Sequence, residues 1–72
     1  MSARAWRRYV GRRILVNLKS GNAITGVLWS TRGNLLVLKG AELLAAEGSP
    51  AKLDGEAIID RGEVDFAQVA SP

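Results

Sequence analysis

Residues 12–40, RRILVNLKSGNAITGVLWSTRGNLLVLKG, decide the fold of this chain. Ile14, Val16 and Leu18 recur at every second position, and this period is typical of a strand with one strongly apolar face. Two clusters of turn-forming residues, Ser-Gly-Asn and Thr-Arg-Gly-Asn, divide the rest of the stretch. The stretch therefore predicts three short antiparallel strands joined by tight turns.

The second strand of this stretch, residues 23–30, contains a glycine at position 26. Leu28 shares the face of Gly26, and Trp29 lies on the opposite face. A glycine inside a strand predicts a sharp bend or a bulge, which a small closed barrel requires. Residues 35–44 are apolar almost throughout, as expected of a strand that is covered on both faces.

Before this stretch, residues 2–10 predict a short helix that Ser2 caps. Trp6, Tyr9 and Val10 fall on one of its faces. A helix of fewer than three turns is not stable alone in water. We therefore expect its aromatic face to dock on its own barrel or on a neighbouring molecule.

After this stretch, residues 45–54 are predicted to form one long loop. Ile58–Ile59 lies in a fourth strand, and residues 64–69 form a fifth. The predicted fold is mainly β: a short N-terminal helix followed by a five-stranded, strongly bent antiparallel small barrel of the SH3-like type. Residues 1–72 form a single domain, and the barrel spans 12–69.

The composition excludes several classes of function. The 72 residues include neither cysteine nor histidine, so disulfides, thiolate zinc sites and the commonest general base are missing. No glycine-rich phosphate loop occurs, and we expect neither an enzyme nor a cofactor. Asp54, Glu56 and Asp60 alternate as solvated carboxylates do, and no metal site is assigned to them. A domain this small needs partner surfaces for stability.

The charge is distributed unevenly along the chain. Residues 1–40 carry eight basic residues and no acid, whereas residues 41–72 carry two basic residues and all seven acids. This asymmetry favours complementarity between copies of the chain or with other proteins of an assembly. No apolar run is long enough to cross a membrane, and the N-terminus lacks the apolar region of a signal peptide. We expect a cytoplasmic protein, or one assembled into a virion.

Two motifs of the chain resemble those of the Sm-like family. The first comprises VNLKSG at 16–21, ITGVL at 24–28 and NLLVL at 34–38, and the second is IIDRGEV at 58–64. Together they extend the resemblance over residues 12–69. The resemblance implies a bent five-stranded barrel whose fourth and fifth strands pair across subunits and close a ring of five to seven copies.

The same resemblance implies an RNA-binding site. Asn34 matches the asparagine of the family's site, and Arg32 could supply a planar stacking group beside it. Arg61 and Gly62 match the Arg-Gly of the second motif, which could contact phosphate. The segment 26–34 is two residues shorter than the family's pattern and lacks its aspartate. The RNA-binding signature is therefore incomplete.

Structural interpretations of these residues stay open beside the functional one. Asn34 could stabilise its own turn. Arg61 could pair with Asp60 or Glu63 around a turn. Asp60 also places a carboxylate beside Arg61, where it would repel a phosphate.

Candidate residues for contacts with other proteins are Trp6, Arg7, Arg8, Tyr9, Trp29 and Phe66. The helix arginines could bind nucleic acid or form a solvated face, and the helix aromatics could pack on the chain's own barrel. Trp29 is either an interface anchor or part of a cross-strand pair on the outer face of the barrel. In each case the exposed apolar surface predicts a partner.

Residues 54–69 also resemble small structural proteins of tailed phages of high-GC bacteria. The preferred interpretation is a non-enzymatic assembly module, a multi-copy barrel that forms a ring or binds within a phage virion as a capsid decoration, minor capsid or tail component. The alternative is an RNA-binding homo-oligomeric ring of the Sm-like type.

Overall fold

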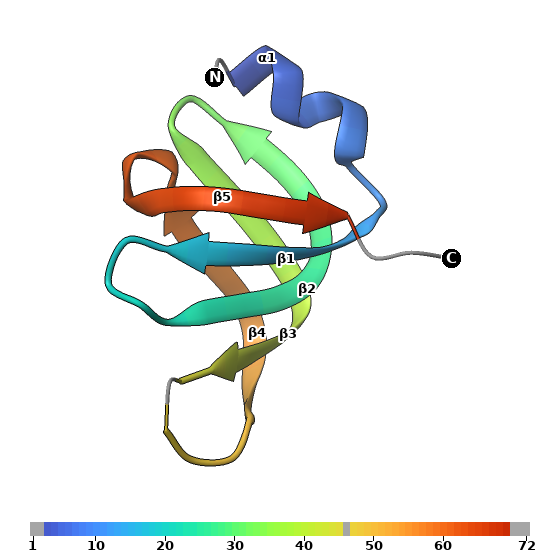
Figure 1. The fold of residues 1–72 in the computed structure, drawn as a ribbon. Coiled ribbons are helices and arrows are strands. Elements are labelled where there is room, and N and C mark those ends of the chain that lie inside the picture. Colours follow the sequence, from blue (N-terminus) through green and yellow to red (C-terminus); the bar gives the residue numbers. More distant parts are fainter. Residues whose placement is uncertain (1–2, 46, 70–72) are drawn as a thin grey trace.

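The computed structural model describes residues 3–45 and 47–69, which form a bent sheet with a short helical segment at one end (Figure 1). The helical segment consists of α1 (Ala3–Trp6) and the 3-10 turn η1 (Arg7–Tyr9). The elements that follow are β1 (Arg13–Leu18), β2 (Ala23–Arg32), β3 (Leu35–Leu44), β4 (Ala51–Asp60), the 3-10 turn η2 (Arg61–Glu63) and β5 (Val64–Val69). None of the described helices is long and apolar enough to cross a membrane.

The five strands form one antiparallel sheet in the order β4-β3-β2-β1-β5. This architecture confirms the predicted mainly-β fold with five antiparallel strands. The sheet coils so that β5 crosses in front of β3 and β4 (Figure 1). β2 is the central strand, and β4 and β5 each have one neighbour in the sheet. Each of these two end strands therefore has one edge of backbone N–H and C=O groups that no other strand of the described residues covers.

The core lies on the concave side of the sheet. Ile14, Val16, Leu28, Leu36 and Leu38 are at most 2% exposed. Each of them comes from alternate positions of β1, β2 or β3, as the period of two predicts. The prediction that the third strand is covered on both faces was wrong. Its side chains alternate between the core and a half-buried or exposed outer face, because no second layer of the described residues covers that face.

Gly26 confirms the predicted bend in the second strand. The pairing of β2 with β3 shifts register between Thr25 and Val27, next to this glycine. A Cβ at position 26 would lie 3.1 Å from the carbonyl oxygen of Lys39 and 3.2 Å from the Cα of Ala41. Glycine therefore allows β3 to approach β2 closely where the sheet bends.

The helical segment docks on the barrel of its own chain. Trp6 is 6% exposed and belongs to the core, and Tyr9 packs against that core. Val10 does not share their face and is exposed, because the chain leaves the helical conformation there with ψ of 133°. The N–H of Gly11 then donates to the carbonyl of Leu28 at 2.7 Å and ties the segment to β2. The predicted cap, Ser2, lies outside the described residues.

The connection between the third and fourth strands is shorter than the predicted 45–54 loop. β4 begins at Ala51, and Leu53 pairs with Ala41 of β3. Gly40 and Gly55 have φ of 59° and 76°, and the register of the β3–β4 pair shifts after Lys39. The two glycines take the conformations that let the hairpin continue past this irregularity, so residues 51–54 extend the strand instead of forming a loop.

Candidate nucleic-acid interface and free sheet edges

The turn between β2 and β3 meets η2, and two sequence-predicted site residues lie at that junction. The backbone N–H of Arg61 donates to the carbonyl of Asn34 at 2.7 Å. Nη2 of Arg61 also donates to Oδ1 of Asn34 at 3.1 Å. The β3–β4 register, in which Leu35 faces Asp60, brings these segments together.

The arrangement leaves exposed donors beside each other. Oδ1 of Asn34 accepts from the guanidinium, so the Asn34 amide nitrogen keeps its two N–H groups for an external acceptor. The remaining N–H groups of Arg61 make no hydrogen bond with the described residues. A carbonyl of a nucleobase and a phosphate oxygen are the acceptors that such a pair fits.

Gly62 and Asp60 form a hydrogen bond that stabilises η2 itself. Oδ1 of Asp60 accepts from the N–H of Gly62 at 2.8 Å and caps the turn. The backbone N–H of Gly62 is thus already engaged within the chain, as the turn interpretation of this segment predicts. The alternative pairing of Arg61 with Asp60 or Glu63 is also absent, because the one ion pair among the described residues joins two other side chains.

Arg32 is the last residue of β2 and faces Leu35 across the same turn. Its side chain is exposed and makes no hydrogen bond to Asn34 or Arg61 within the described part of the chain. Gly33, with φ of 54°, supplies the left-handed conformation of this tight turn. Arg32 therefore flanks the Asn34–Arg61 pair without belonging to it.

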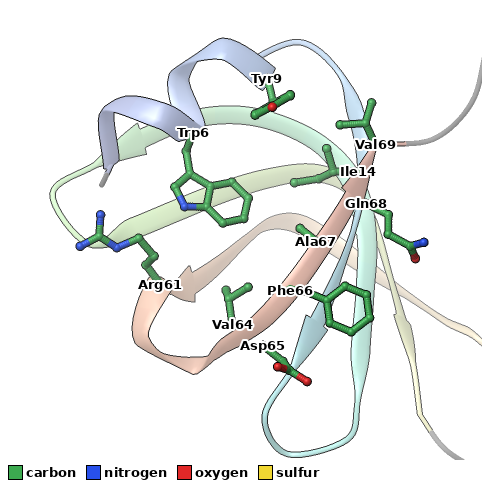
Figure 2. Close-up of a pocket in the computed structure, with 10 residues that line it drawn as sticks. All are labelled: Trp6, Tyr9, Ile14, Arg61, Val64, Asp65, Phe66, Ala67, Gln68 and Val69. Carbon is green, nitrogen blue, oxygen red and sulfur yellow. The ribbon is translucent and has the colours of Figure 1, made fainter. Parts of the chain in front are cut away.

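A cavity of about 590 Å³ lies between the helical segment and β5 (Figure 2). Trp6 and Tyr9 line it from the helical side, Phe66 lines it from β5, and Arg61 and Val69 lie at its two ends. The indole N–H of Trp6 is buried there without a hydrogen-bond partner among the described residues. The cavity is thus a groove along the end strand of the sheet.

The predicted protein-contact residues divide into two groups. Trp6 and Tyr9 are covered by their own chain, which makes Trp6 a core residue and not an exposed anchor. The exposed residues are Arg7, Arg8, Trp29 and Phe66. Within the helical segment, the aromatic side chains point to the barrel and the arginine side chains point to solvent.

Two surface features have no counterpart among the sequence-based predictions. Ile58 of β4 is 63% exposed. Its position between Ala57 and Ile59, which both face the core, is the sequence pattern that indicates this exposure. The Nζ of Lys39 lies 3.9 Å from the centre of the Trp29 ring. No local pattern indicates this second feature, because the two residues are on different strands.

The arrangement of strands is shared with solved structures. The SmAP1 heptamer from P. aerophilum aligns with a TM-score of 0.81 and 24% identity over 96% of this chain and 92% of that chain. A heptameric archaeal Sm protein aligns with a TM-score of 0.79 and 25% identity over 94% of this chain and 98% of that chain. The fold is Sm-like. No family model and no curated protein matches the Sm-like chain.

The Sm-like fold confirms the family resemblance that the two sequence motifs indicated. The looser likeness to phage structural proteins has no support from the matched structures, and neither does a place in a virion. Both matched Sm-like proteins are described as heptameric.

Proposed function

We propose that this chain forms a homo-oligomeric Sm-like ring that binds single-stranded RNA and has no enzymatic activity. The observation that carries the proposal is the pair of hydrogen bonds joining Arg61 to Asn34. These two residues come from the two separate motifs that the Sm-like resemblance assigns to RNA binding.

The end strands of the sheet support assembly. β4 exposes Ile58 and β5 exposes Phe66, which are 63% and 52% exposed. Each strand also has a backbone edge that pairs with no other strand in the described part of the chain. Pairing β4 of one copy with β5 of the next satisfies the backbone groups and places the two apolar side chains at the contact. Repetition of the same contact closes a ring.

The exposed charges support RNA as the ligand. Arg7, Arg8, Arg12 and Arg13 are all exposed, and none of them forms an ion pair with the described residues. In a ring these groups repeat once per copy and create a positive potential that attracts phosphate. The donors of Asn34 and Arg61 then supply the contact with a base edge and its phosphate.

The test is binding of a fluorescent uridine oligonucleotide by wild type, Asn34→Ala and Arg61→Ala. Removal of one hydrogen bond to a base or a charged group lowers affinity by roughly 10- to 100-fold. The control is Lys52→Gln, which removes an exposed charge at the distant end of β4. The proposal fails if wild type does not bind at low salt, or if the control loses as much affinity as Arg61→Ala.

A further inference from the structure

The outer face of the sheet carries an aromatic side chain that is held in place but half uncovered. Trp29 of β2 is 54% exposed. The ammonium of Lys39 lies 3.9 Å from the centre of its ring. Lys39 is in turn 4.0 Å from the carboxylate of Glu56 on β4. The lysine thus occupies one side of the indole, and a cation–π contact restrains the ring.

A strand irregularity places the indole there. The β2–β3 pairing shifts register between Leu28 and Ser30, so Trp29 is the extra residue of a bulge. Leu28 is fully buried, and Trp29 points to the opposite side. Bulges reorient side chains in this way. The exposure of Trp29 is therefore built into the strand.

Assembly through the sheet edges leaves this residue uncovered. β2 is the central strand, with two strands on each side of it. Contacts between β4 and β5 of neighbouring copies bury the ends of the sheet and not the middle of its outer face. Each copy of a ring would accordingly present one Trp29 to solvent.

We propose that Trp29 and Lys39 form a second nucleotide site, at which a base of single-stranded RNA stacks on the uncovered part of the indole. This inference rests on the proposed RNA-binding function and extends it to a surface outside the Asn34–Arg61 pair. Stacking on an exposed aromatic side chain is the common way in which proteins bind unpaired bases without strict sequence preference.

Strand β2 runs from Trp29 to the turn that holds Asn34. Arg32 is three residues from Trp29 on β2, a separation of about 10 Å at the rise of a β-strand. Arg32 also flanks the turn that holds Asn34. A strand of RNA that leaves the Asn34–Arg61 pair would pass this guanidinium before it reaches the indole.

The charges on the outer face suit a phosphate backbone. The face includes the cations Arg13, Arg32 and Lys39 and the acids Glu56 and Asp60. Asp60 is engaged with the N–H of Gly62. Glu56 is half exposed and 4.0 Å from Lys39, a weak pair that a phosphate can displace. Leu35 and Ile58 also lie on this face and are 41% and 63% exposed, so the indole has both charged and apolar neighbours. The cations beside it and the RNA-binding function proposed above favour a base over a protein partner as its ligand.

The test compares a uridine dinucleotide, which is too short to span both sites, with a uridine oligomer of about 20 nucleotides, which exceeds the ~4–16 nucleotides that one OB-fold barrel binds. For Trp29→Ala we expect about 5- to 100-fold weaker binding of the long oligomer and an unchanged affinity for the dinucleotide. Trp29→Phe keeps a stacking ring and should retain most of the affinity. Asn34→Ala, in contrast, should weaken binding of both lengths.

Indole fluorescence gives a second measurement. Trp6 is buried and Trp29 is exposed, so quenching by the long oligomer should occur in wild type and be lost in Trp29→Phe. Equal affinities of wild type and Trp29→Ala for the long oligomer would overturn the second site while leaving the first intact. Loss of binding to a co-purified protein with unchanged RNA affinity would overturn it in favour of protein docking. Failure of wild type to bind either oligomer would overturn both proposals.

Discussion

The guanidinium of Arg61 donates to the side-chain oxygen of Asn34 at 3.1 Å, although 27 residues separate the two in the sequence. Their backbones are also joined, at 2.7 Å. The contact connects the β2–β3 turn to η2. The carboxamide of Asn34 and the guanidinium of Arg61 therefore lie side by side on the surface, and the position of each depends on the other.

This dependence predicts a non-additive effect on RNA binding. In a double-mutant cycle with Asn34→Ala and Arg61→Ala, the double variant should bind a uridine oligonucleotide about as weakly as the worse single variant. The coupling energy for residues in direct contact is about 0.5–3 kcal/mol. Titration by fluorescence anisotropy measures it. Additive losses would mean that the two side chains act independently.

The free edges predict how assembly can be disrupted. Phe66→Lys or Ile58→Lys places a charge on an exposed apolar position of an end strand, and we expect smaller particles by light scattering. Circular dichroism should still show a folded β protein. Trp29→Ala, on the central strand, is the matched apolar control and should keep the particle size of wild type. An unchanged mass for both lysine variants would rule out these edges as the contact.

Gly26 predicts a stability effect without any change in surface chemistry. A Cβ at this position would contact the Lys39 carbonyl at 3.1 Å, and backbone cannot move aside as a flexible side chain does. We expect Gly26→Ala to lower the free energy of unfolding by about 1–3 kcal/mol in a urea titration. Ser30→Ala on the same strand should change it far less. Equal stability of the two variants would show that the sheet can bend without glycine.

The helix arginines predict a salt dependence. If Arg7 and Arg8 bind phosphates, the double variant Arg7→Gln/Arg8→Gln should bind RNA more weakly at low salt. The slope of log affinity against log salt should become shallower by about 0.7 for each phosphate that the variant no longer neutralises. A parallel shift with an unchanged slope would place these two residues away from the RNA.

Much of the sheet follows from local pattern. The alternation of Ile14, Val16 and Leu18 identified β1, and the glycine at position 26 identified the bend in β2. These features depend on the period of a strand and on the space that a glycine leaves, and neighbouring residues determine both. The end of the loop before β4 was missed, because its position depends on pairing with β3 across Gly40 and Gly55.

The candidate sites depended more on tertiary structure. The sequence by itself supplied the residue types, the uneven charge and the two motifs that contain Asn34 and Arg61. It could not establish that these two side chains touch, that Trp6 is core, or that Lys39 covers one side of Trp29. Those relationships arise from strand register and from bulges, which are set by contacts between residues far apart in the chain. The strand period is local, whereas the neighbours of a side chain across the sheet are not.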